Sequence, residues 1–283
     1  MKKFFIIANQ SKKDTVEFAN EIKEYIELKG GESVLDSCTA GQGMHTDATS
    51  VPEDTECVIV LGGDGTILRA AADLADLTVP FLGINLGTLG FLSAAEKCGM
   101  KDAIDHMIRE DYVVERRMMI FGKTMACGKL ADDTRALNDI VITGAKPMQL
   151  VNLTVYVNGL LLNKYYADGL IISTPTGSTG YNLSAGGPII NPTAKNMILT
   201  PICPHSMHHR SIVLSAEDVI KIVVEPDRYG AKQCATALFD GAHQVDLETG
   251  CEITIRRSEK ITKIIKLSEE GFLETLHHKL KDD

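Results

Sequence analysis

Apolar residues recur with two different periods along the first hundred residues. The short apolar runs Phe4–Ala8, Cys57–Leu61 and Pro80–Asn85 have the length of buried strands. Between them, the stretches Val16–Ile26 and Ile67–Leu77 carry apolar residues at the 3.6-residue spacing of a helix. Strands that alternate with helices form a largely parallel sheet covered on both faces. The pattern therefore predicts an N-terminal α/β domain, Rossmann-like, over residues 1–109.

The pattern changes near residue 110 to strand-sized runs with few helical stretches between them. Leu153–Val157 and Leu160–Asn163 flank Asn158-Gly159, a dipeptide that closes two-residue hairpins. Later runs of similar length are Ile212–Leu214, Val219–Val224, Cys234–Phe239 and Glu252–Arg256. We therefore predict a mostly antiparallel, β-sandwich-like C-terminal domain over residues 110–266, and an α+β fold of two domains. The tail 267–283 returns to a helical pattern with Ser268 as its cap, and is expected to pack back on the first domain.

Composition and charge exclude several classes of protein. With 44% hydrophobic and 24% charged residues, the chain has the balance of a globular protein. Its net charge of −9 argues against a nucleic-acid partner, because phosphate backbones require a clustered cationic face. Seven cysteines without a CxxC pair suggest neither a disulfide framework nor a zinc site. The histidines of C-P-H-S-M-H-H at 203–209 also lack zinc-site spacing, so no set of metal-ligating side chains is predicted.

The apolar run at the N-terminus is too short for the core of a signal peptide. No stretch approaches the eighteen or so apolar residues that a membrane helix requires. We therefore expect a soluble, cytoplasmic protein with no membrane partner.

The strongest chemical signal is Gly62-Gly63-Asp64-Gly65-Thr66, which lies between a predicted strand and a predicted helix. Glycines allow a tight turn with free backbone N–H groups, and a helix N-terminus adds unpaired donors and a positive dipole end, so phosphate oxygens fit there. A carboxylate among phosphates is useful if it binds a metal or takes a proton from an attacking hydroxyl, which are candidate roles for Asp64. Arg69, one turn further on, either meets phosphate or is an exposed helical arginine. The alternative for the whole motif is a tight turn capped by an aspartate.

Two further segments are candidates for the same site. Gly83–Phe91 is a strand that runs into a glycine-spaced loop, and the carboxyl ends of parallel strands are where such sheets bind ligands. Its Phe91 either stacks on a base or belongs to the core. Asn138-Asp139 pairs an amide with a carboxylate, which suits ribose hydroxyls or a base edge, although a plain turn into a strand explains it equally well.

The stretch Tyr166–Pro188 is rich in glycine and small hydroxyl residues. Such a composition leaves little side chain for packing and much for hydrogen bonding. A cluster of turns explains part of it, but a binding function explains its length better.

These segments together resemble the NAD kinase family. In chain order they read LGGDGTILRAA at 61–71, GINLGTLGFL at 83–92, LNDIVI at 137–142, DGLIISTPTGSTGYNLSAGGPII at 168–190 and TPICPHS at 200–206. The GGDGT element alone is shared with diacylglycerol- and sphingosine-type lipid kinases, whereas the block at 168–190 followed by ICPHS is typical of NAD kinases.

The resemblance implies a nucleotide site between an N-terminal α/β domain and a C-terminal β domain, and homo-oligomers, dimers or often tetramers. It implies ATP, or in some members polyphosphate, as the phosphoryl donor, a divalent cation (Mg²⁺ or Mn²⁺), and NAD as the substrate that becomes NADP. Asp64 would accept the proton of the ribose 2′-hydroxyl, and Tyr181 would stack on the dinucleotide. The remaining residues expected to bind the two nucleotides are Gly62, Gly63, Gly65, Thr66, Arg69, Phe91, Asn138, Asp139, Asp168, Thr179, Gly180, Asn182 and Ser184.

The chain departs from the family pattern at three positions. Asp139 replaces the usual Glu, Gly180 stands where many bacterial members have Ala, and Ala242 follows Phe239–Gly241 where many have Gln. Two rival hypotheses remain. A lipid kinase shares the GGDGT loop, but no basic amphipathic helix is evident that would bring it to a bilayer. A non-catalytic dinucleotide sensor would not need Asp64.

Overall fold

The computed structural model describes residues 1–8, 13–36, 45–87, 90–126, 128–205, 210–267 and 272–281. The chain divides into two compact units, of which the first comprises Met1–Arg117 with Thr262–Asp283 and the second Met118–Ile261. Two long strands, β6 (Val113–Ala126) and β17 (Glu252–Lys266), contribute residues to both units.

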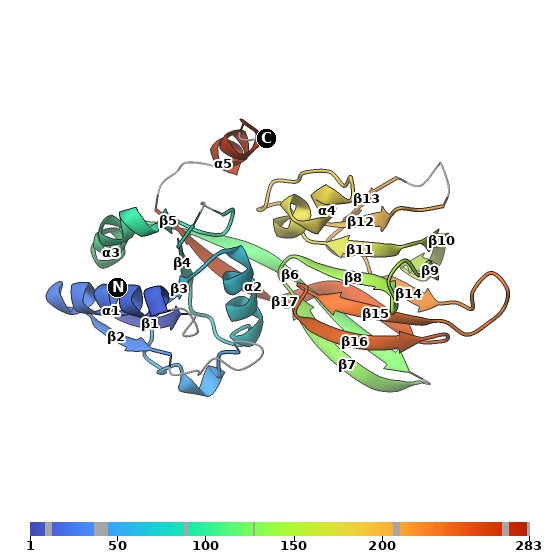
Figure 1. Cartoon of the computed structure of the whole chain (residues 1–283), viewed down its shortest axis with the longest axis horizontal. Helices are drawn as coiled ribbons and strands as arrows, with labels where there is room; N and C mark the ends of the chain where they lie inside the picture. Colours follow the sequence, from blue (N-terminus) through green and yellow to red (C-terminus); the bar gives the residue numbers. More distant parts are fainter. Residues whose placement is uncertain are drawn as a thin grey trace. The chain divides into compact units, whose positions relative to one another are not determined.

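The first unit is built on a parallel sheet (Figure 1). Its strands, in sheet order, are β2 (Glu32–Leu35), β1 (Lys3–Ala8), β3 (Cys57–Leu61) and β4 (Phe81–Asn85), with β5 (Ala95–Glu96) and the end of β17 both paired in parallel to β4. Its helices are α1 (Lys13–Leu28), α2 (Asp64–Asp73), α3 (Met100–Arg109) and α5 (Phe272–Lys281).

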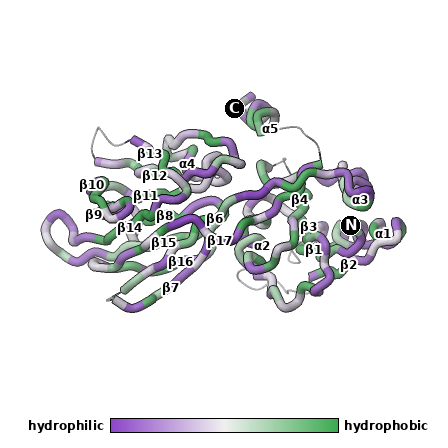
Figure 2. Tube along the Cα trace, turned by 180° about the vertical axis from the view of Figure 1, so that it is seen from behind, coloured by the Kyte–Doolittle hydropathy of each residue, from purple (hydrophilic) through white to green (hydrophobic). Residues whose placement is uncertain are grey.

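Helices cover both faces of this sheet, because the side chains of each buried strand alternate between the faces. Ile6 of β1 packs in one apolar cluster with Ile22 of α1 and Ile104 of α3. On the other face, a Cβ atom at Gly83 of β4 would lie 2.5 Å from Cδ1 of Ile67 in α2. Figure 1 shows α1 and α3 on one side of the sheet and α2 on the other, and the central strands are coloured as mostly apolar in Figure 2.

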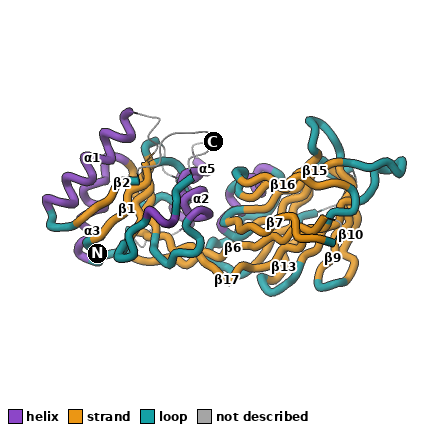
Figure 3. Tube along the Cα trace, turned by 90° about the horizontal axis from the view of Figure 1, so that it is seen from below, coloured by secondary structure: helices purple, strands orange, loops and turns teal. Residues whose placement is uncertain are grey.

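The second unit consists almost entirely of strands and loops (Figure 3). One antiparallel sheet has the order β13 (Ile212–Ser215), β12 (Asn196–Ile202), β11 (Gly169–Ser173), β8 (Asp139–Gly144), β15 (Cys234–Phe239) and β16 (His243–Glu248). The other strands are β10 (Leu160–Ala167), β9 (Val151–Val157) and β14 (Ile220–Val224), which precede β17 in sheet order, and β7 (Lys129–Ala136), which pairs with β6.

A single apolar core joins the two sheets of the second unit. It contains residues of β8 and β11 from one sheet together with residues of β9 and β14 from the other, among them Ile142, Ile172, Val155 and Ile222, each fully buried. This face-to-face packing accounts for the alternation of buried and half-buried positions along β14, and of buried and exposed positions along the second half of β16.

The structure confirms the predicted α+β fold, with a mainly parallel N-terminal sheet and antiparallel C-terminal sheets. The observed element boundaries differ from the predicted ones where the spacing of apolar residues is a weak guide. Helix α2 begins at Asp64, inside the glycine motif, and β17 extends to Lys266 rather than ending near Arg256. Helix α3 was not predicted at all, although Met100, Ile104 and Met107 have helical spacing. The proposed cap, Ser268, lies outside the described residues. None of the described helices is long and apolar enough to cross a membrane.

Candidate functional site

The glycine motif forms the junction between β3 and α2. Gly62 has a φ of +153°, and a Cβ atom there would lie 2.5 Å from Oγ1 of Thr66. The Gly62 N–H donates to the carbonyl of Ile84 in β4 over 3.1 Å, which ties the turn to the neighbouring strand. Only glycine fits this backbone without strain, so the motif can place the first turn of α2 directly after the strand.

A hollow of about 290 Å³ opens at the N-terminal end of α2. Its lining residues are Ile7, Thr46, Gly63, Gly65, Thr66, Arg69 and Ala70. The structure thus brings together four of the predicted phosphate-binding residues, including Arg69. The first turn of a helix carries N–H groups without intrahelical partners and a positive dipole end, and Arg69 adds a full charge, so the hollow favours an anion.

Asp64 is held in place by the loop that follows β4. Its Oδ2 accepts a hydrogen bond from the Phe91 N–H (2.8 Å) and its Oδ1 accepts one from the Leu92 N–H (3.2 Å). A Cβ atom at Gly90 would lie 1.9 Å from Oδ1, so the close approach of the loop requires glycine there. An ionised carboxylate can accept about four hydrogen bonds, and two sites therefore remain for a cation or a hydroxyl proton.

Phe91 contacts the C-terminal helix rather than the hollow. Its ring centroid lies 6.1 Å from that of Phe272 in α5, and the Lys279 ammonium lies 5.4 Å from the Phe91 ring centroid. Of the two roles considered for Phe91, packing within the first unit is the one that the structure displays. Thr88 and Leu89 of the same motif lie outside the described residues.

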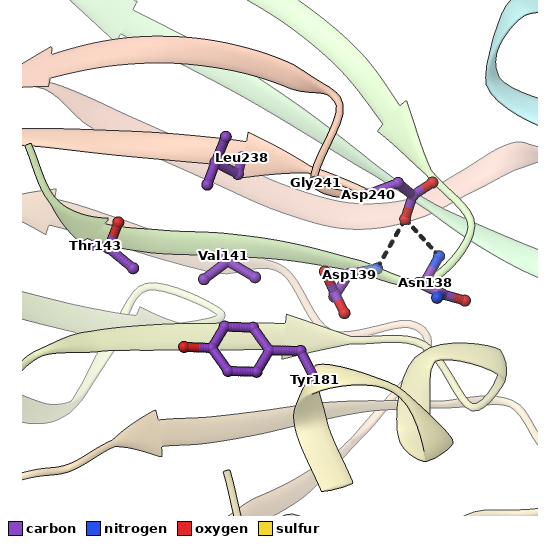
Figure 4. Close-up of a pocket in the computed structure, with 8 residues that line it drawn as sticks. All are labelled: Asn138, Asp139, Val141, Thr143, Tyr181, Leu238, Asp240 and Gly241. Atoms are coloured by element: carbon purple, nitrogen blue, oxygen red, sulfur yellow. Dashed lines mark hydrogen bonds between the residues drawn. The ribbon is translucent and has the colours of Figure 1, made fainter. Parts of the chain in front are cut away.

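A second pocket, of about 380 Å³, lies in the second unit (Figure 4). It is lined by Asn138, Asp139, Val141, Thr143, Tyr181, Leu238, Asp240 and Gly241. Strands β8 and β15 supply an apolar wall through Val141 and Leu238, and the Tyr181 ring faces Val141 in Figure 4. Carboxyl and amide groups gather at one end. The pocket combines an apolar slot with a polar end, as nucleoside-binding sites do.

Asp240 organises the polar end of this pocket. Its Oδ2 accepts a hydrogen bond from the Leu137 N–H (2.7 Å), and its Oδ1 accepts from the N–H groups of Asn138 (2.7 Å) and Asp139 (3.0 Å). From the opposite side, the Thr174 N–H donates to the Asn138 carbonyl (2.8 Å). Asn138 and Asp139 are therefore fixed by bonds on both sides of the backbone.

The carboxyl groups of Asp139 and Asp240 share one desolvated site. Burial, and secondarily the charge of Asp240, raises the pKa of Asp139 to about 7. Burial also raises the pKa of Asp240 to about 6, although the three N–H groups favour its charged form. Because Asp240 has those donors, Asp139 is the member of the pair that holds its proton to the higher pH.

The hydroxyl-rich segment holds the pocket's shape as well as lining it. Tyr181, in the short helix α4 (Tyr181–Ser184), is 47% exposed and faces the pocket. Asn182 is fully buried, donating to the carbonyls of Ser178 and Pro188 (both 3.1 Å) and accepting from Oγ1 of Thr200 (2.7 Å). Its amide supports the turn from within and is not part of the pocket lining.

The other predicted residues of this segment lie around the pocket. Gly180 adjoins it, since a Cβ atom there would lie 3.6 Å from Nδ2 of Asn138. The Thr179 hydroxyl donates weakly to the Thr176 carbonyl (3.4 Å), and Ser184 is exposed. Asp168 immediately precedes β11, whose Gly169 pairs with Thr143, at the opposite end of β11 from Asp139. None of these three side chains lines the pocket as described.

Asp240 was not predicted as a site residue. The Phe239–Gly241 segment was considered only for the residue that follows it, although an aspartate between a strand and a glycine is a local signal for a turn. Nothing in the local pattern indicates that this carboxylate meets Asn138, roughly one hundred residues earlier.

Among the described residues, no group of three or more His, Cys, Asp or Glu side chains is placed to hold a metal ion. His208 and His209, considered above for zinc, lie outside the described residues.

Comparison with known proteins places both halves of the chain in one family. The sequence profile of the ATP-NAD kinase N-terminal domain matches residues 4–112, and that of the ATP-NAD kinase C-terminal domain matches residues 137–267. An NAD kinase from Agathobacter rectalis is 42% identical over 284 residues, covering 99% of each chain. The crystal structure of an NAD kinase from Archaeoglobus fulgidus in complex with ATP is similar over the full length of both chains, with 26% identity and a TM-score of 0.77. Yeast NADH kinase complexed with NADH shares the fold, with 24% identity and a TM-score of 0.86 over 99% of this chain and 88% of that one.

Proposed function

The chain belongs to the NAD kinase family of phosphotransferases, and from this premise we propose that it transfers the γ-phosphoryl group of ATP to the 2′-hydroxyl of the adenosine ribose of NAD, giving NADP and ADP. The observation that carries the proposal is the placement of Asp64. Its carboxylate is fixed by two backbone N–H groups and stands between two glycines that line an anion-favouring hollow.

The first unit is proposed to hold the donor phosphates. Gly63 and Gly65 would offer backbone donors and Arg69 a charge, while Gly62 and Thr66 form the turn that presents them. In the transfer step, the ribose oxygen forms a bond to the γ-phosphorus and the bond from phosphorus to the bridging oxygen breaks. ADP leaves with that electron pair, and the hydroxyl proton passes to the Asp64 carboxylate.

The second unit is proposed to bind NAD. Asn138 and Asp139 would contact ribose hydroxyls or a base edge at the polar end of the pocket, and Tyr181 would stack on a ring along its apolar wall. The path of the dinucleotide would be shaped by the other residues expected to bind it, which are Asp168, Thr179, Gly180, Asn182 and Ser184.

A divalent cation, Mg²⁺ or Mn²⁺, is proposed to accompany ATP. Mg²⁺ commonly takes one or two carboxylates together with substrate phosphates and water, and Asp64 is the carboxylate of the glycine motif. When bound, the cation would neutralise charge on the donor phosphates.

We also propose a homo-oligomer and a cytoplasmic location. The exposed apolar side chains Leu160 and Leu161 of β10 and Val213 of β13, both edge strands, support a homo-oligomer. Seven cysteines without a disulfide spacing support a cytoplasmic location.

The test is a coupled assay of the purified protein with ATP, Mg²⁺ and NAD, in which an NADP-specific dehydrogenase reports NADP. We expect NADP formation by the native protein and a loss of about two to four decades in turnover for Asp64→Asn, with binding of ATP and NAD retained in calorimetry. The proposal would be refuted if the native protein formed no NADP from NAD, including in repeats with Mn²⁺ and with polyphosphate. Phosphorylation of dispersed diacylglycerol would then favour a lipid kinase, and binding without transfer would favour a sensor.

A further inference from the structure

The loop that fixes Asp64 also accepts hydrogen bonds from a lysine. Lys266, at the end of β17, donates from Nζ to the carbonyl of Phe91 (3.0 Å) and to the carbonyl of Ser93 (2.9 Å). The N–H groups of Phe91 and Leu92 in the same segment donate to Asp64. Residues 91–93 thus stand between an ammonium and a carboxylate.

One peptide unit connects the two charges directly. The carbonyl of Phe91 and the N–H of Leu92 belong to the same planar group, so a bond at its oxygen fixes the direction of its N–H. A positive charge on the oxygen also polarises the group and strengthens donation by the N–H. Lys266, the Phe91–Leu92 peptide and Asp64 therefore form a short chain of hydrogen bonds.

The surroundings of Lys266 are charged and partly desolvated. Burial, and secondarily the nearby Arg117 of β6, lowers the pKa of Lys266, while Glu115 of β6 and Asp64 of α2 act in the opposite direction. Arg117 is itself buried and paired with Glu115.

We propose that Lys266 is a positioning residue for the reaction, which holds residues 91–93 and, through the N–H groups of Phe91 and Leu92, sets the position of the Asp64 carboxylate. This inference rests on the proposed function of Asp64 as the group that receives the proton. Lys266 itself contacts neither the hollow nor the pocket lining.

Lys266→Met keeps the length of the side chain but leaves two carbonyls without their donor. We expect kcat to fall by about 10- to 100-fold, the scale of a small misplacement of a reacting group. The KM values for ATP and NAD should stay within about twofold, because the lining of both cavities is unchanged. Lys266→Arg retains the donors to the two carbonyls, and should recover most of kcat.

Lys263→Met is the matched control. Lys263 belongs to the same strand and also donates from Nζ to a backbone carbonyl, that of Thr78 (2.9 Å), which is outside the loop that holds Asp64. This variant should keep the native kcat. An equal loss of activity in both Met variants would mean that the lysines only stabilise the fold and would overturn the inference.

Hydrogen exchange of the Phe91 and Leu92 amides provides a readout that does not depend on turnover. In Lys266→Met both amides should exchange faster than in the native protein, and faster than in Lys263→Met. Unchanged exchange would overturn the positioning role, whereas a native protein that makes no NADP would count against the proposed function alone. If Lys266→Met does not fold, Lys266→Leu, which also lacks a donor, takes its place. A native kcat and native exchange of both amides in Lys266→Leu would then contradict the inference.

Discussion

Replacing Asp139 with asparagine should make the protein more stable at neutral pH. The folded state holds the Asp139 carboxyl in a desolvated site beside Asp240, where its pKa rises from 3.8 to about 7. Between those values the folded state binds a proton that the unfolded chain has released, so the stability of the native protein falls as the pH rises through this window. Asparagine is neutral throughout and escapes this loss. Each pKa unit corresponds to about 1.4 kcal/mol, so the gain above pH 7 is at most about 4 kcal/mol.

Urea unfolding at pH 5, 6, 7 and 8 measures the effect. The difference in unfolding free energy between Asp139→Asn and the native protein should grow by up to about 1.4 kcal/mol per pH unit from pH 5 to 7, and level off at pH 8. Asp133→Asn is the control, since Asp133 is exposed on β7, and should stay within about 0.5 kcal/mol of the native protein at every pH. A difference that is constant across this range, or a variant that is less stable than the native protein at pH 8, would refute the account of the pair.

Three further substitutions test the geometry of the two cavities. Gly90→Ala should lower kcat by about 100-fold or more, because the new methyl group would occupy the place of the Asp64 Oδ1 atom, and steady-state assays with unchanged ATP binding in calorimetry would establish this. Arg69→Gln should raise the KM for ATP by about tenfold without a matching rise for NAD; equal rises for both would contradict a role at the donor phosphates. Gly180→Ala should change the unfolding free energy by less than about 1 kcal/mol, because its Cβ would lie 3.4 Å from the Gly177 carbonyl and 3.6 Å from Nδ2 of Asn138, and a larger loss in urea unfolding would show that the turn tolerates only glycine.

The tolerance expected at Gly180 bears on the departures from the family pattern. An alanine there would lie in ordinary contact with Asn138. At Asp139, the carboxyl sits close enough to Asp240 for the charge of Asp240 to contribute to its raised pKa.

Much of the fold follows from local pattern. Period and length alone predict β1, β3, β4 and α1, because each element buries a face that repeats at a fixed spacing. The glycine motif likewise predicts its own place between a strand and a helix. Strands β6, β7 and β12 were not predicted.

The two-domain α+β fold, the family and the residues that turn tightly at the ends of the strands can be read from the amino-acid sequence, because these depend on neighbours along the chain. Which distant groups meet is visible in the folded structure alone. Asp240 bonds the Asp139 N–H across 101 positions, and Lys266 reaches the Phe91 carbonyl across 175. The structure also shows that Asn182, a polar residue expected to bind the ligand, is buried and stabilises the turn. Periodicity reports which side of an element is buried, whereas partners between elements depend on strand order and register, and these are set by the packing of the whole unit.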